Sequence, residues 1–175
     1  GDIINSSPVY VGAPLFSYTD TGYAAFKTAQ ASRTAVVYAG SNDGMLHAFK
    51  ATNLPNDGVA QGSELWAFIP TAVLPNLYKL ADSSYATRHT YFVDGAPVVG
   101  DVYDSATSSW KTILVGGLNA GGRAYYALDI TNPTSPVLLW EFTDSNLGLT
   151  FGNPMIVKRN NGTWVVVFAS GYNNT

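Results

Sequence analysis

The feature that most constrains this chain is an internal repeat. The segment VVYAGSNDGMLHAFKATN, residues 36–53, recurs in altered form as ILVGGLNAGGRAYYALDITN, residues 113–132. A proline among small or β-branched residues precedes each copy, and a tryptophan-bearing segment follows it, at Trp66 and Trp140. Repeats of about 40 to 45 residues with four short strands each are typical of β-propeller blades. The sequence therefore predicts an all-β protein built from stacked four-stranded sheets.

The turn and strand chemistry within each repeat agrees with this fold. Asn42-Asp43-Gly44 lies between apolar runs and offers the positive φ that a tight hairpin turn needs. We expect Ala120-Gly121-Gly122 to serve the same purpose in the second copy. The runs 35–39 and 112–115 are apolar at nearly every position, which is typical of strands covered on both faces. Residues 45–50 alternate, as expected for a strand with one less covered face.

These patterns divide the chain into about two and a half blades of a β-propeller. We assign residues 1–70 to blade one, 71–92 to an inter-blade insertion, 93–143 to blade two and 150–175 to the first half of blade three. Trp66 and Trp140 are interpreted as wedges packed between adjacent blades, where an indole buries a large apolar area.

Two segments have the composition of helices inserted between strands. Residues 22–31 contain helix formers, and Asp20 is available as an N-cap. Residues 74–80 predict a short helix with Pro75 near its first turn, where the missing amide hydrogen is harmless.

Composition narrows the classes of function. A net charge of −3 and a pI near 5.1 give no electrostatic reason to bind nucleic acid or an anionic membrane. The absence of cysteine excludes disulfides, thiolate catalysis and cysteine zinc sites. No apolar run is long enough to span a bilayer. Because a propeller needs at least about four blades to close, we expect the chain to be a piece of a longer domain with open strand edges.

A search for catalytic, cofactor-binding and metal-binding residues leads to no assignment. The two histidines do not form a metal-ligand pair. Ser41 is followed by a hairpin turn, whereas the nucleophilic serine of a hydrolase is followed by a helix. The glycine-rich stretch 116–122 leads into a strand, whereas a phosphate-binding loop needs a helix N-terminus. The carboxylates tested as calcium ligands lack a compact Asp-x-Asp-x-Asp spacing and are interpreted as structural; they are Asp43, Asp94, Asp101 and Asp104. Of these, Asp94 and Asp104 are expected to start turns. Asp129 is expected to form an Asx-turn, and His47 and His89 are interpreted as ordinary structural residues.

The order of the segments resembles a known family. GSNDGMLHAF, VGGLNAGGRAYYALDITNP and FGNPMIVKRNNGTWVVVFASGYNN occur together and span essentially the whole chain. This succession is similar to the C-terminal β-propeller of the PilC/PilY family, the type IV pilus tip-associated biogenesis factors and adhesins of Gram-negative bacteria.

The resemblance implies a modified propeller of about seven blades. It implies a non-enzymatic scaffold at the cell surface or pilus tip, outer membrane and periplasm, which supports pilus extension, attachment and twitching motility. Minor pilins and a host surface receptor are the partners implied. The family's calcium loop lies after the segment present here, so no residue of this chain is carried over as a ligand.

Two other functions stay open at this point. Ala-Leu-Asp-x-Thr followed by a tryptophan strand also resembles quinoprotein dehydrogenase propellers, which bind pyrroloquinoline quinone with calcium. Alternatively, the chain binds carbohydrate by stacking sugars on exposed tyrosines, with Tyr125, Tyr126 and Tyr172 as candidates.

Overall fold

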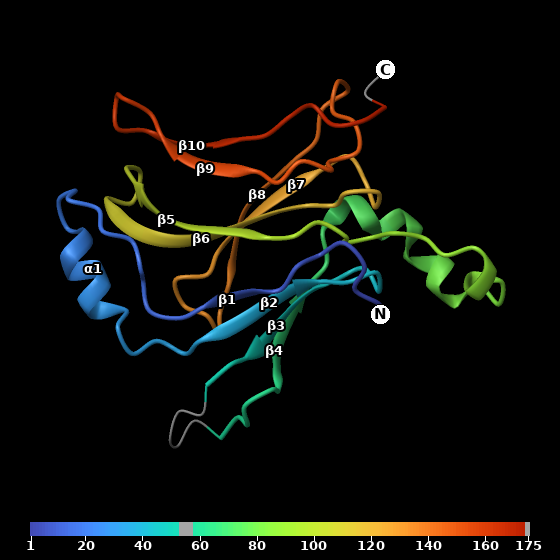
Figure 1. Cartoon of the computed structure of the whole chain (residues 1–175), viewed down its shortest axis with the longest axis horizontal. Coiled ribbons are helices and arrows are strands. Elements are labelled where there is room, and N and C mark those ends of the chain that lie inside the picture. The colour runs from blue at the N-terminus through green and yellow to red at the C-terminus, as the bar shows by residue number, and fades with distance from the viewer. Residues whose placement is uncertain (53–57, 174–175) are drawn as a thin grey trace.

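The computed structural model describes residues 1–52 and 58–173, and these form three antiparallel sheets arranged as a fan (Figure 1). Blade one contains β1 (Val9–Val11), β2 (Val36–Gly40), β3 (Leu46–Lys50) and β4 (Glu64–Phe68). Blade two contains β5 (Val98–Asp104), β6 (Ser109–Gly117), β7 (Tyr125–Asp129) and β8 (Val137–Phe142). In blade three, β9 (Met155–Lys158) and β10 (Trp164–Val167) form a hairpin.

Strand order within each sheet follows chain order, so every sheet is a simple meander. The sheets approach one another where β1, β5 and β9 meet. Such a radial stack of meanders is a partial β-propeller, and the predicted fold class is confirmed. The part of blade three predicted for residues 174–175 lies outside the described residues.

Within blade two, strand β6 is buried on both faces. Leu114 of β6 belongs to an apolar cluster shared with Tyr38 and Leu46 of blade one. Its neighbours Ile113 and Val115 point the other way and share a second cluster with Trp164 of blade three. The continuous apolar run in β6 therefore reflects burial on two sides, as its sequence predicted.

A repeated backbone irregularity places the tryptophans between blades. Ala48 pairs with Trp66 across β3 and β4, and Ala127 pairs with Trp140 across β7 and β8. The register shifts directly after each alanine, which is how a β-bulge bends a strand and redirects its side chains. The indole of Trp66 donates to the Pro133 carbonyl of blade two at 2.7 Å. Trp140 packs against the cluster that blades two and three share, so both indoles act as the predicted wedges.

The helices lie in the connections between strands, as expected, but they begin and end at other residues than predicted. α1 (Tyr23–Ala29) follows Gly22, which takes the N-cap position with a φ of 81°. The predicted cap by Asp20 is wrong, because its carboxylate contacts Lys158 of β9. The 3-10 helix η1 (Thr71–Ala81) begins earlier than predicted, so that Pro75 lies in its interior and not in its first turn. A second 3-10 helix, η2, spans Tyr85–Thr87.

Within the described residues, none of these helices has the length and apolar character required to cross a lipid bilayer.

The α1 insertion of blade one fastens the other two blades. The buried Tyr23 hydroxyl donates to Asp101 of β5 at 2.7 Å. In return, the indole of Trp110 in β6 donates to the Thr21 carbonyl at 3.0 Å. Together with the contact between Asp20 and Lys158, these bonds connect one insertion to both neighbouring sheets.

The hairpin turns after β2 and β6 both need a residue with positive φ, and different residue types supply it. Gly44 has a φ of 94°, as the Asn-Asp-Gly sequence predicted. In blade two the residue with positive φ is Asn119, at 50°, so the expectation that the following glycines supply it is wrong. Gly121 is required for another reason, because a Cβ atom there would overlap the Phe92 carbonyl. That carbonyl precedes blade two, so the turn and the entry to the sheet are packed backbone against backbone.

The Gly121→Ala substitution should therefore destabilise the fold. We expect the free energy of unfolding to fall by about 2 kcal/mol, because the added methyl forces backbone apart in a packed region. Urea unfolding followed by tryptophan fluorescence measures the change. Gly152→Ala is the matched control, since its Cβ would meet only Ala169, at 3.9 Å. Equal stability of the two variants would contradict this account of the turn.

Candidate functional site

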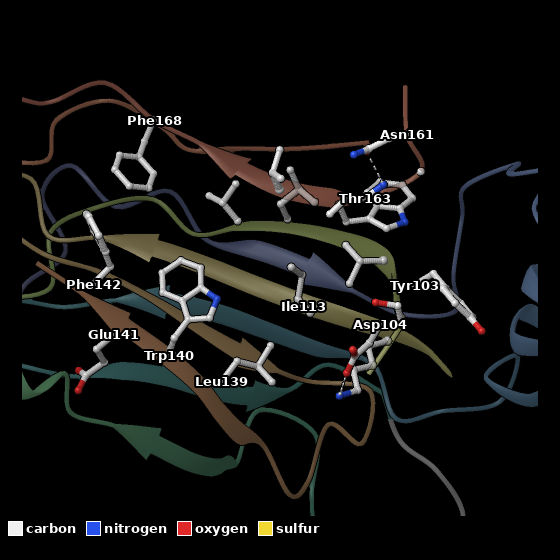
Figure 2. Close-up of a pocket in the computed structure, with 18 residues that line it drawn as sticks. Tyr103, Asp104, Ile113, Leu139, Trp140, Glu141, Phe142, Asn161, Thr163 and Phe168 are labelled. Atoms are coloured by element: carbon white, nitrogen blue, oxygen red, sulfur yellow. Dashed lines mark hydrogen bonds and ion pairs between the residues drawn. The ribbon is translucent and has the colours of Figure 1, made fainter. Parts of the chain in front are cut away.

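A groove of about 870 Å³ lies between blades two and three (Figure 2). Its walls are mainly apolar and aromatic, from β6 and β8 on one side and β10 on the other. The principal residues are Ile113, Leu139, Trp140, Phe142, Trp164 and Phe168.

Charge is confined to the ends of this groove. Lys111 donates to Asp104 at 2.8 Å at one end, and Asp129 lies 3.8 Å from the same ammonium. The hydrogen bonds from Lys111 and Thr107 lower the pKa of Asp104 to about 2. Glu141 accepts the backbone amide of Thr71 at 2.6 Å. Each of these carboxylates accepts a hydrogen bond from a protein group. They do not face each other as the general acid and general base of a catalytic pair would.

The groove corresponds to positions that strands fill elsewhere in the fold. In blades one and two, a third and fourth strand follow the equivalents of β9 and β10. Among the described residues, β10 pairs only with β9, so its other edge has no neighbouring strand.

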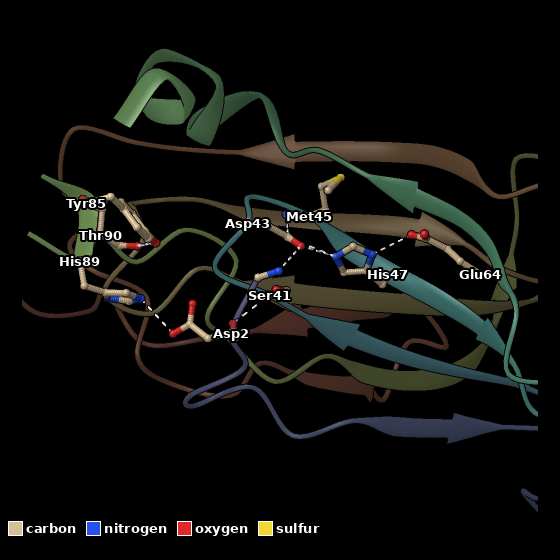
Figure 3. A network of polar contacts seen from close by, with 10 residues as sticks. Asp2, Ser41, Asp43, Met45, His47, Glu64, Tyr85, His89 and Thr90 are labelled. Carbon is tan, nitrogen blue, oxygen red and sulfur yellow. Dashed lines mark hydrogen bonds and ion pairs between the residues drawn. The ribbon is translucent and has the colours of Figure 1, made fainter. Parts of the chain in front are cut away.

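The two histidines do not converge on one site (Figure 3). His47, in β3, lies between Asp43 and Glu64, with ring nitrogens 3.0 and 2.7 Å from the carboxylates. His89 lies beyond η2 and contacts Asp2 at 2.9 Å. The interpretation of both as structural residues stays a prediction, and sequence reasoning missed the carboxylate on either side of His47.

The four carboxylates tested as calcium ligands lie apart and have separate partners. Asp101 accepts hydroxyl hydrogens from Tyr23 and Thr112. Asp104 starts a turn by accepting the amide of Ala106, as predicted. Asp94 is not the expected turn starter, because its buried carboxylate accepts two hydrogen bonds from Asn5, 89 residues away.

Within residues 1–52 and 58–173, no three histidine or acidic side chains are grouped so that they could hold a metal ion. Asp129 forms the predicted Asx-turn, accepting the amide of Thr131 at 2.9 Å. The residues present do not fit a calcium site of Asp-x-Asp-x-Asp type, because each tested carboxylate is already used by a local or inter-blade donor.

The glycine-rich segment 116–122 leads into strand β7, as predicted, and no helix follows it. Its glycines permit close approach. A Cβ on Gly116 would overlap the Tyr126 hydroxyl, and one on Gly117 would lie 3.1 Å from the Thr150 carbonyl. A phosphate-binding function has no structural support here, since the helix N-terminus that such loops use is lacking in this segment.

The tyrosines proposed for carbohydrate stacking are mostly inaccessible. Tyr125 and Tyr126 are 0% and 1% exposed, so the expectation that they stack on sugars is wrong. Tyr172 is 67% exposed and contacts Phe151 edge to face. β-Strand tyrosines here fill the space between blades, where a ring offers large area with few rotatable bonds.

Sequence reasoning missed two networks that join the blades. Arg33 donates to the Gly12 carbonyl at 2.6 Å and to the Thr112 hydroxyl at 2.7 Å, and Thr112 donates to Asp101 at 2.6 Å. Burial lowers the pKa of Arg33, and the charge of Asp101 opposes that effect. No local sequence pattern predicts these hydrogen bonds, because Arg33 belongs to blade one whereas Thr112 and Asp101 belong to blade two.

The second network is aromatic and could have been found. Trp110 and Trp164 occupy similar positions at the start of the second strand of blades two and three. Tyr18, in the α1 insertion, lies 5.7 Å from the ring of Trp110 and 5.3 Å from that of Trp164. The repeated Ser-Trp and Thr-Trp pairs were the signal.

Taken together, these features define a class of protein: a partial β-propeller in which apolar clusters and several buried hydrogen bonds join adjacent blades. The family described as the PilY1 beta-propeller domain matches residues 1–175.

Curated relatives extend this match. A type IV pilus biogenesis factor PilY1 homolog of Xylella fastidiosa is 43% identical over 185 residues, covering 100% of this chain and 14% of that protein. The type IV pilus biogenesis factor PilY1 of Pseudomonas aeruginosa is 44% identical over 183 residues, covering 98% of this chain and 15% of its own length. The chain thus spans about a seventh of the curated relatives that it matches.

A solved structure agrees with both. The crystal structure of the Pseudomonas aeruginosa PilY1 C-terminal domain superposes with a TM-score of 0.73 at 34% identity, over 94% of this chain and 32% of that one. This chain belongs to the PilY1 β-propeller family, and the resemblance inferred from its sequence is confirmed.

The buried Tyr126 hydroxyl gives a prediction about stability. It has no hydrogen-bond partner, whereas the Tyr125 hydroxyl donates to the Gly152 carbonyl at 3.1 Å. Tyr126→Phe should raise the free energy of unfolding by about 1 kcal/mol, because it removes a buried polar group that gains nothing in return. Tyr125→Phe should lower it by about 1 kcal/mol. Urea unfolding of both variants tests the contrast, and a loss of stability in Tyr126→Phe would overturn it.

Proposed function

We propose that this chain is a non-enzymatic scaffold segment of a type IV pilus biogenesis factor. The observation that carries the proposal is the family match over the whole chain, together with relatives named as pilus biogenesis factors. The use of polar groups to join sheets agrees with a rigid support. In this proposal, the propeller holds partner proteins through its loops and strand edges.

The finer parts of the proposal concern place and partners. The segment acts at the cell surface or pilus tip, outside the inner membrane of a Gram-negative bacterium, and contacts minor pilins and a host surface receptor. Through those contacts it supports pilus extension, surface attachment and twitching motility. The exposed side chains of Leu74 and Tyr78 on η1 are available for such contacts, since they are 51% and 70% exposed.

No observation in the described residues favours the alternative function, a quinoprotein dehydrogenase. That chemistry places a quinone over an indole at the propeller axis. Trp66 and Trp140 stand on β4 and β8, the last strands of their sheets, while the sheets approach one another at β1, β5 and β9.

Substitutions that unfold this segment should abolish piliation and twitching in cells. In the bacterium that encodes this chain, we expect Trp66→Ala with Gly121→Val to remove surface pili, seen by electron microscopy, and twitching, seen on agar. The paired changes open a cavity and create an overlap at the junction of blades one and two. Gly152→Ala is the control that should retain both phenotypes. Normal piliation with a demonstrably unfolded segment would refute the scaffold proposal.

Calcium is proposed to bind elsewhere in the longer protein, because the carboxylates tested here already have protein partners. Thermal unfolding of residues 1–175 should then show the same midpoint in calcium as in a chelator. A longer domain that includes the family's calcium loop is the positive control and should gain stability with calcium. A calcium-dependent rise in the midpoint of residues 1–175 would contradict this placement.

A further inference from the structure

His47 lies between two carboxylates, one at each ring nitrogen (Figure 3). Its Nδ1 is 2.7 Å from Oε1 of Glu64, and its Nε2 is 3.1 and 3.0 Å from the two oxygens of Asp43. An ionised carboxylate can only accept hydrogen bonds, and a neutral imidazole has only one N–H. Both contacts are therefore satisfied together only when both ring nitrogens carry a proton.

We propose that His47 is held as an imidazolium between Asp43 and Glu64 and acts as a pH-sensitive clamp on the junction between blades one and two. The clamp is closed while the ring is charged and is released when the ring loses a proton. This device goes beyond the scaffold function, and its test does not depend on that function.

The surroundings strengthen the charged form. The side chain of His47 is only 13% exposed, and its ring stacks on Phe49 at 5.7 Å between centroids. Burial opposes the charge, but the hydrogen bonds to Glu64 and Asp43 outweigh it and raise the pKa of His47 above its usual 6.5. For Asp43, burial also opposes ionisation, and the bond from His47 contributes to a lowered pKa.

Other titratable groups lie close to Asp43 and must be included. In a chain that begins at residue 1, the amino group of Gly1 lies 3.1 Å from Asp43 and contributes to its lowered pKa. The Tyr85 phenol is near enough to sense the charge of Asp43, and burial is the larger cause of its raised pKa, so it stays neutral around pH 7. On β2 and β4, the residues directly opposite His47 are Ala39 and Ala67, which do not titrate.

Release of the clamp has a path to the blade junction. Asp43 sits in the turn whose neighbour Asn42 accepts the backbone amide of Phe92 at 3.1 Å, and the Ser41 carbonyl accepts the amide of Val93 at 3.3 Å. Phe92 and Val93 are buried residues that lead into blade two. A neutral His47 leaves one carboxylate facing a nitrogen lone pair, which weakens the turn that holds this entry in place.

The sign of the pH effect follows from the raised pKa of His47. The stabilisation is fully present below pH 6.5, the usual value for histidine, and is lost as pH rises through the higher value of the folded protein. Asp43, with its lowered pKa, contributes stability above its usual value of 3.8 and loses it in acid. The clamp is therefore strongest between these limits.

The test is an NMR titration of the imidazole nitrogens in the chain of residues 1–175. Both ring nitrogens of His47 should show protonated shifts at pH 6.5, with a midpoint above that value. The His89→Gln variant removes the other histidine signal and assigns the resonance. Acetylation of the Gly1 amine should leave the double protonation intact.

Charge-neutral variants complete the experiment. Glu64→Gln and Asp43→Asn keep an acceptor oxygen at each position, yet each should lower the midpoint, and every full pH unit corresponds to a tenfold weaker proton affinity. In the wild type, amide exchange at Phe92 should accelerate above the midpoint more than the intrinsic rise with pH, and less so in His47→Gln. A single protonated nitrogen at pH 6.5, or unchanged midpoints in both carboxylate variants, would overturn the proposal.

Discussion

Burial of strand β6 of blade two on both of its faces is the interaction on which the rest of the structure depends. Leu114 faces blade one while Ile113 and Val115 face blade three, so a single strand contributes to both apolar clusters. A four-stranded sheet alone cannot cover such surfaces, and each sheet is stable because its neighbour excludes water. The repeated alanine and tryptophan pairs follow from the same requirement, since a small residue and a bulge bring a large indole between sheets.

Several buried polar groups also join one blade to the next. Arg33, Thr112 and Asp101 form a chain of bonds across blades one and two, and Tyr23 adds the α1 insertion to it. Buried polar groups are costly without partners, so a connected network makes the relative position of the sheets specific as well as stable. The contacts of His47 differ from these, because both of its carboxylate partners, Asp43 and Glu64, lie within blade one.

Much of this arrangement could be predicted because propellers repeat. The turn at Gly44, the two-sided strands and the tryptophan wedges each arise from local pattern, and all were confirmed. Two predictions were wrong because the hydrogen-bond partner of a carboxylate lies far away in the sequence. Asp20 contacts Lys158 and does not cap its helix, and Asp94 bonds to Asn5 and does not start a turn. In both cases a distant donor competes successfully with the neighbouring backbone amides.

The sequence by itself determined the fold class and the succession of strands, because hydrophobic period, turn residues and repeat spacing can be followed along the chain. The family came from the resemblance of whole segments to known relatives. Only the tertiary structure decided which polar atoms meet. Tyr23 and Asp101 are 78 residues apart, and His47 and Glu64 are joined across two strands whose register shifts beside them. Such pairings depend on how sheets stack and where a bulge falls, and these are set by packing of the whole chain and not by any one segment.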